Sequence, residues 1–144
     1  MYKSVKFTTL IFLLILTSAT VTFGDEKLGK LFIKAASTEI DGQQLPDMEL
    51  EMSVKDMKKR VGKFILVDKE IEADFLIIIL ERIDVPSSDG ISAKSIRATL
   101  YVRDNAKWKP ATKLQSGVNN AIWGAAARNI IKNAEKWVKA NVNQ

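Results

Sequence analysis

The sequence contains no cysteine and no histidine, and these two absences remove most metal-binding and nucleophilic chemistry. Zinc, copper, haem and iron–sulfur sites lose their usual ligands. Catalysis by a serine–histidine–aspartate or a cysteine–histidine arrangement is excluded as well. Without cysteine there is no disulfide framework, so a folded domain must be held together by its hydrophobic core alone, and no cysteine can carry a lipid anchor.

The common phosphate-binding and catalytic motifs are also missing. Neither GxxxxGK[ST] nor GxGxxG occurs, and the nearest text to a Ser-x-x-Lys catalyst, Ser92-Ala-Lys94, has the wrong spacing. Three pairs of carboxylates remain as candidates for acid–base catalysis: Glu49 with Glu51, Glu70 with Glu72, and Asp68 with Asp74. Two of these pairs lie in charged links or edges, where carboxylates serve solubility. We therefore expect no enzyme, no metal and no cofactor.

The first 24 residues have the composition of an export signal. Two lysines precede an uninterrupted apolar run over residues 10–16, and small residues follow, with cleavage expected after Ala19 or Gly24. The alternative is a retained membrane anchor, but the apolar stretch is at the short end of the roughly 17–25 residues that span a bilayer. We predict a signal peptide over residues 1–24 and a periplasmic or extracellular protein of a bacterial cell envelope.

Residues 25–144 have the size of one domain with a single core. The predicted signal contributes two of the 22 basic residues and no acidic one, so 20 basic residues remain against 17 acidic ones, a net charge of +3. Such a mild excess does not indicate a nucleic-acid-binding protein, whose basic residues would be denser and clustered.

Five segments have strand character, at residues 28–37, 64–68, 73–85, 96–103 and 108–115. The fourth is the clearest, because apolar residues occupy the even positions while Arg97, Thr99, Tyr101 and Arg103 occupy the odd ones. Asp104-Asn105 is a turn signal, so the last two strands are expected to form a hairpin.

Two helices are predicted, a short one and a long one. Ser53 with Asp56 fits a capping box, which indicates a helix through Arg60 that Gly62 would end. Before it, the turn signals in residues 38–47 are expected to break regular structure. The long helix is predicted from about residue 118 to residue 140, because apolar residues recur there at steps of three and four: Trp123, Ala127, Ile130, Ala134 and Trp137.

The predicted order is β-α-β-β-β-β-α. It favours an α+β fold of two layers, with a mixed sheet of about five strands and both helices packed on one face. The strand Phe75–Leu80 is apolar at six consecutive positions, so it is apolar on both faces of the sheet. The helices would cover one of these faces, and no predicted helix is left to cover the other.

The segment FILVDKEIEADFLIIIL, residues 64–80, resembles the small envelope domains of the TolB amino-terminal and curli-secretion (CsgG-like) type. In these domains a short strand ending near Val-Asp leads through a brief link into Ala-Asp and a hydrophobic strand. The matching residues are Val67, Asp68, Ala73 and Asp74, with Trp108 near the start of the second strand of the hairpin. The resemblance implies an extracytoplasmic α/β domain without catalytic residues that is used for assembly or partner contact. The lack of a lipid-bearing cysteine departs from the lipidated members.

Two surfaces are candidates for binding. Arginine, tyrosine and tryptophan are enriched at protein interfaces, and four such residues are expected on the open sheet face: Arg97, Tyr101, Arg103 and Trp108. They would form the rim of a contact site whose centre is the uncovered side of the third strand, although the same pattern also fits an ordinary wet sheet face. The long helix carries a basic stripe of Arg128, Lys132, Lys136 and Lys139. This stripe is either solvated or in weak contact with an anionic membrane surface.

These observations lead to a non-enzymatic envelope protein, an assembly or partner-binding module that uses its open sheet face to pair with itself or with another protein. The alternative is a carrier of a lipid or a small ligand, with a pocket under residues 38–52. An enzyme of unknown class is the third candidate, and it would need polar groups that converge in a cleft.

Overall fold

Five strands form one mixed sheet in the order β4-β1-β5-β6-β7. The computed structural model describes residues 26–86, 88–90, 92–117 and 122–142. The strands are β1 (Lys30–Ala35), β4 (Ile65–Leu66), β5 (Phe75–Val85), β6 (Ala93–Asp104) and β7 (Lys107–Gln115). Strand β1 pairs in parallel with β4 and β5, whereas β5, β6 and β7 pair antiparallel. The predicted mixed sheet of five strands is confirmed.

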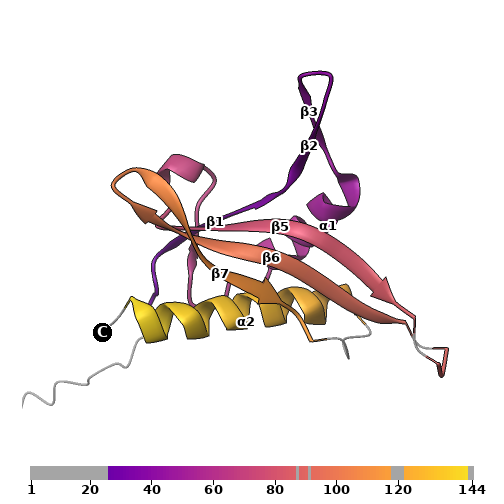
Figure 1. Ribbon diagram of the computed structural model, residues 1–144. Helices are drawn as coiled ribbons and strands as arrows, with labels where there is room; N and C mark the ends of the chain where they lie inside the picture. Colours follow the sequence, from indigo (N-terminus) through magenta and orange to yellow (C-terminus); the bar gives the residue numbers. More distant parts are fainter. Residues whose placement is uncertain (1–25, 87, 91, 118–121, 143–144) are drawn as a thin grey trace, which may run out of the picture.

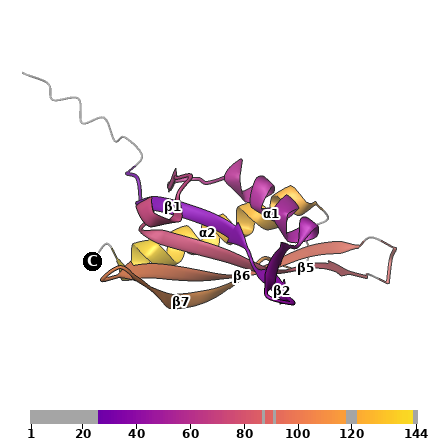
Figure 2. The same cartoon turned by 90° about the horizontal axis from the view of Figure 1, so that it is seen from above.

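The two helices, α1 (Met48–Lys58) and α2 (Trp123–Asn141), cover one face of this sheet (Figures 1 and 2). Helix α1 contacts β1, β5 and α2, and helix α2 contacts β6 and β7. The core lies between the two layers, and its largest fully buried members include Leu31, Ile33, Met57, Ile77, Ile79, Ile96, Leu100, Ile130 and Ile131. The predicted α+β fold of two layers, with both helices on one face, is therefore confirmed.

Strand β5 lies at the centre of the sheet and is apolar on both of its faces. Phe75, Ile77 and Ile79 point to the helices and are buried. A bulge at Leu80 shifts the pairing with β6, so that Glu81 lies opposite Arg97 instead of following the earlier alternation. Beyond the bulge, the even-numbered residues of β5 point to the helices and the odd-numbered residues point to the outer face. The chain can therefore end its apolar run and place polar residues on the helix side, where the guanidinium of Arg82 lies 3.8 Å from the ring centroid of Trp123.

The start of α1 differs from the prediction. Asp47, not Ser53, is the N-cap, and its Oδ1 accepts hydrogen bonds from the backbone N–H groups of Glu49 (2.9 Å) and Leu50 (3.2 Å). Ser53 is buried in the middle of the helix, where its hydroxyl accepts a hydrogen bond from Arg82 Nη1 at 3.2 Å. Because the Ser53 hydroxyl is bonded to Arg82, it does not cap the helix. Pro46 comes directly before Asp47, and since proline is not accommodated inside a helix, the helix begins after it.

Residues 37–46 also differ, because they form a second sheet where a break was predicted. Strands β2 (Ser37–Ile40) and β3 (Gln43–Pro46) pair antiparallel in a hairpin. Asp41 and Gly42 at its tip have φ angles of 51° and 75°, the left-handed conformation that a two-residue hairpin turn needs at both central positions. The hairpin rises from the sheet on the side opposite to α2 (Figure 1).

Other boundaries follow the prediction more closely. The turn at Asn105 and Ala106 closes the predicted hairpin between β6 and β7 with φ angles of 48° and 64°. Strand β4 has only two residues where five were predicted, since the chain leaves the sheet edge after pairing with two residues of β1. The predicted signal peptide and the first residues of the predicted long helix, 118–121, lie outside the described residues.

The N-cap assignment predicts the effect of substituting Asp47. Asp47→Ala removes the acceptor for two backbone donors and is expected to lower the free energy of unfolding by about 1 kcal/mol. Asp47→Asn keeps a capping oxygen and is expected to be close to neutral. Urea unfolding followed by circular dichroism measures both. Equal stability of Asp47→Ala and the wild type would contradict a helix that begins at Met48.

Candidate functional site

The four residues predicted to line the open sheet face all lie on or beside it, but they do not form one site. Arg103 on β6 lies opposite Trp108 on β7 in the strand register, and its guanidinium is 4.4 Å from the centroid of the indole ring. Tyr101 is two residues away and half-buried. Arg97 is six residues from Arg103, which is roughly 20 Å along a strand. The predicted site residues are therefore divided between two ends of the sheet face.

At the first end, Glu70 joins strands that are not neighbours. Residue 70 lies in a short 3-10 helix, η1 (Glu70–Glu72), in the link from β4 to β5. Its carboxylate accepts hydrogen bonds from Lys34 Nζ on β1 and from Trp108 Nε1 on β7, both at 2.8 Å. Because β5 and β6 lie between these two strands, the link must cross the outer face of the sheet, and Figure 1 shows η1 on the side opposite to α2.

The side chain of Arg103 holds the same link by hydrogen bonds to the backbone of the link. Its Nη2 donates to the carbonyl oxygen of Glu70 at 2.6 Å, and its Nε donates to that of Ala73 at 2.7 Å. Arg103 and Trp108 therefore use their donors within the chain. Their predicted role in the rim of a contact site stays a prediction.

The outer face of β5 is buried at one end and open at the other. Leu76 lies on the outer face between Phe32 of β1 and Tyr101 of β6 in the register, and it is only 1% exposed. Ile78 is half-buried, and Leu80, at the bulge, is 45% exposed. The continuous apolar centre predicted for this face is thus largely sealed by the chain itself, and Leu80 is the residue of β5 that stays open there.

The second end lies beside Leu80. Arg97 Nη1 donates to Glu81 Oε2 at 3.0 Å across the β5–β6 pair, and both side chains are about half exposed. Arg97 and Leu80 line a shallow hollow of about 340 Å³ with Lys113 and other residues of β7. This hollow is small and open to solvent.

Several large apolar side chains are exposed together on the β2–β3 hairpin and the adjoining turn of α1. All eight residues of the two strands are exposed. Four large apolar side chains of this region have exposed fractions between 46% and 76%: Ile40, Leu45, Met48 and Met52. Ile40 and Leu45 share one face of the ribbon, because Ile40 pairs with Gln43 and Leu45 with Thr38. The dipeptide Asp41-Gly42 flanked by apolar residues was the signal that could have revealed this ribbon.

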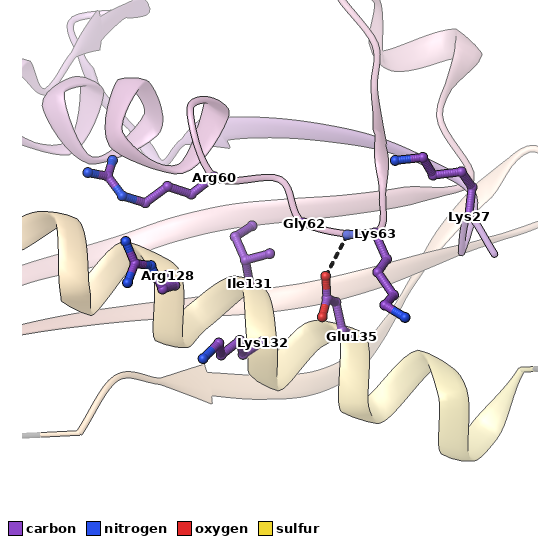
Figure 3. Close-up of a pocket in the computed structure, with 8 residues that line it drawn as sticks. All are labelled: Lys27, Arg60, Gly62, Lys63, Arg128, Ile131, Lys132 and Glu135. Carbon is purple, nitrogen blue, oxygen red and sulfur yellow. Dashed lines mark hydrogen bonds between the residues drawn. The ribbon is translucent and has the colours of Figure 1, made fainter. Parts of the chain in front are cut away.

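A groove lies on the opposite side of the molecule, between α2 and the link that joins α1 to β4 (Figure 3). Its volume is about 450 Å³. Five basic side chains and one acidic side chain line it together with Gly62 and Ile131: Lys27, Arg60, Lys63, Arg128, Lys132 and Glu135. The predicted basic stripe of α2 is exposed at all four positions, but only Arg128 and Lys132 belong to the groove, whereas Lys136 and Lys139 lie outside its lining.

The single carboxylate of the groove is part of its wall. Glu135 Oε1 accepts a hydrogen bond from the backbone N–H of Lys63 at 2.6 Å. Gly62 has a φ of +59°, and a side chain there would collide with the Glu135 carboxylate. Glycine therefore allows the link to turn against α2. Within the described part of the chain, the side chains of Lys27, Arg128 and Lys132 form no ion pair or hydrogen bond.

The described residues contain neither a membrane-spanning helix nor a cluster of metal ligands. Neither α1 nor α2 is sufficiently long and apolar to cross a bilayer. Over the same residues there is no cluster of three or more acidic side chains that could hold a metal ion.

Comparison with known proteins shows little likeness. No protein-family model matches the sequence, and no curated protein matches it either. Among solved structures, the chain is similar to a hypothetical protein, CT253 from Chlamydia trachomatis, with a TM-score of 0.48 and 14% identity over 78% of this chain and 98% of that one. Likeness at this level supports no argument about function. The resemblance to TolB amino-terminal and curli-secretion domains stays a prediction.

The Glu70 network predicts a pH-dependent contribution to stability. The hydrogen bond from Lys34 is the main cause that lowers the pKa of Glu70 below its usual 4.5, with the Trp108 hydrogen bond and the charges of Lys34 and Arg103 adding to it against the effect of burial. A carboxyl whose pKa is lower in the folded state stabilises the fold above its unfolded pKa, and this stabilisation is lost as the pH falls through the folded-state pKa.

Glu70→Gln is therefore expected to lower the free energy of unfolding at pH 7 by on the order of 1 kcal/mol. The difference from the wild type should shrink as the pH falls below 4.5 and through the folded-state pKa of Glu70. Chemical unfolding at a series of pH values measures it, with Glu72→Gln, an exposed neighbour in η1, as the matched control. A difference between Glu70→Gln and the wild type that does not vary with pH would count against the network.

Proposed function

We propose that this protein is a non-enzymatic module of the cell envelope that binds a protein partner. Its contact surface is the β2–β3 hairpin together with the first turns of α1 and the open part of the sheet face at Leu80. The observation that carries the proposal is the hairpin, a ribbon whose eight strand residues are all exposed. We name the surface formed by Ile40, Leu45, Met48 and Met52 the hairpin surface.

The hairpin surface suits a partner for energetic reasons. A two-stranded ribbon without a packed face is marginally stable in water, and both of its strands have a free edge that could pair with another strand. Each of its large apolar side chains still exposes about half of its area or more, so burial against a partner would contribute roughly 1 kcal/mol per side chain. Such clustered apolar area usually marks a contact site.

The sheet face contributes in a different way from the one predicted. Arg103 and Trp108 are held by the Glu70 link, so in this proposal they give the surface its shape. Arg97 and Leu80 remain exposed and are the residues of the sheet proposed to contact the partner. Tyr101, half-buried beside Leu76, completes the surface between them.

The carrier alternative has less support. A carrier would need residues 38–52 to fold over the sheet and enclose a cavity, but these residues rise away as a hairpin and then continue into α1 on the helical face. An enzyme also has less support, because the groove with the most charged groups holds one carboxylate, already bonded to the backbone of Lys63. The export signal expected at residues 1–24 is the reason for placing the module in the envelope.

Photo-crosslinking in the cells that produce the protein tests this function. A photoreactive phenylalanine at position 45 is expected to give discrete crosslinked species, whereas the same group at position 71 is expected to give few. Ile71 is the matched control because it is also an exposed aliphatic residue, 79% exposed, but lies on η1. Equal yields and the same products from positions 45 and 71 would contradict a contact surface at the hairpin.

Substitution separates binding from folding. Ile40→Ser should reduce crosslinking from position 45 several-fold, since it removes an apolar contact on the same face of the ribbon. Its effect on the midpoint of thermal unfolding should be small, because an exposed side chain contributes little burial. Loss of crosslinking together with a large loss of stability would instead assign Ile40 a role in the fold.

A further inference from the structure

The charges of this chain are divided between two separate surfaces. Residues 35–54 contain no lysine or arginine and five acidic residues: Glu39, Asp41, Asp47, Glu49 and Glu51. This segment has a net charge of −5, so the remainder of residues 25–144, which together carry +3, has a net charge of +8. The acidic segment comprises the hairpin and the first turns of α1. The four apolar residues of the hairpin surface therefore lie within a strongly acidic segment.

The groove beside α2 has the opposite charge. Its five basic side chains against one carboxylate give the lining a net charge of +4. Arg60 and Arg128 point towards each other at one end, and Lys27 and Lys63 lie near the other (Figure 3). The residues of α2 that line it, Arg128 to Glu135, extend over about 10 Å of helix. That length accommodates the end of a two-stranded ribbon, whose strands are about 5 Å apart.

The two surfaces of one copy cannot meet. The hairpin rises on one side of the sheet and α2 lies on the other (Figure 1), and α2 contributes Arg128, Ile131, Lys132 and Glu135 to the groove. The five-stranded sheet lies between the hairpin and α2. An attraction between the acidic hairpin and the basic groove can therefore be satisfied only between different copies.

We propose that the partner of the hairpin surface is a second copy of this chain, and that the acidic hairpin of one copy docks in the basic groove of the next. This inference rests on the proposed function, because it names the partner of the same surface. The interface is heterologous: each copy presents a hairpin to one neighbour and a groove to another. Such head-to-tail contacts produce either a closed ring or an open filament.

Three properties of the two surfaces fit each other. Glu39 and Asp41 at the hairpin would face Arg128 and Lys132, which have no ion-pair partner within the described part of the chain. Ile40 lies between the two acids and would meet the aliphatic stems of the lysine and arginine side chains that line the groove, since Ile131 itself is only 1% exposed. Because the contact is mainly between exposed charges, its strength should fall as salt screens them.

The test uses mature protein purified from cells that express the full chain. The groove variant carries Arg128→Glu and Lys132→Glu, and the hairpin variant carries Glu39→Lys and Glu49→Lys. Matched controls make the same charge changes at exposed positions outside the two surfaces: Lys136→Glu with Lys139→Glu on α2, and Asp68→Lys with Glu72→Lys on the β4–β5 link. Circular dichroism establishes that every variant is folded, and sedimentation velocity gives the size distribution.

The expected pattern is specific to a head-to-tail contact. The wild type and both controls associate, and their association weakens about tenfold or more when NaCl is raised from low to high concentration. Each variant alone is monomeric. An equimolar mixture of the groove variant and the hairpin variant associates again, because one intact hairpin and one intact groove remain.

Three results would overturn the inference. If the wild type is a monomer at every concentration, no second copy binds, and the proposed function then depends on the crosslinking at position 45 alone. If the wild type is a dimer but the two variants do not pair when mixed, the interface is symmetric and joins like surfaces. If the wild type is monomeric and binds vesicles of anionic phospholipid through Arg128 and Lys132, the groove faces a membrane.

Discussion

The structure depends on the covering of one strand from both sides. Strand β5 is apolar over Phe75–Leu80 and lies at the centre of a sheet whose helices all pack on one face. The second face is covered by the link from β4 to β5, which Glu70 fixes to β1 and β7 through two hydrogen bonds of 2.8 Å. Leu76 points to this second face and is only 1% exposed.

This covering decides which apolar side chains of β5 stay exposed. Since the Glu70 link occupies one end of the outer face, Leu80 is the exposed large apolar residue of β5, and the hairpin surface exposes four further large apolar side chains. The groove also depends on a hydrogen bond between a link and a regular element. Gly62 and the hydrogen bond from Lys63 N–H to Glu135 hold the α1–β4 link against α2, and Arg128 and Lys132 beside that contact form no ion pair within the described part of the chain. The proposed assembly uses both consequences.

The sequence predicted the features that repeat and missed those that depend on a distant partner. The alternation of β6 and the apolar spacing of α2 are periodic signals, and they gave the sheet, the two layers and the exposed basic stripe. The capping box at Ser53 was a local pattern that a tertiary hydrogen bond from Arg82 overrides. Glu70 lies in a charged link with no periodicity, so nothing in the sequence indicated that its carboxylate reaches Lys34 and Trp108, 36 and 38 residues away. The groove was not predicted because its walls come from segments far apart in the chain.

The central claim is that the hairpin belongs to an interface more than to the fold. Hydrogen–deuterium exchange of the purified protein, followed as a function of its concentration, tests this most directly. The account predicts that amides of residues 37–46 exchange far faster than those of β5 when the protein is dilute, and that they gain protection, together with the residues around the groove, as the concentration rises. Hairpin amides that are as slow as β5 in dilute protein, or that keep one rate at all concentrations, would contradict it.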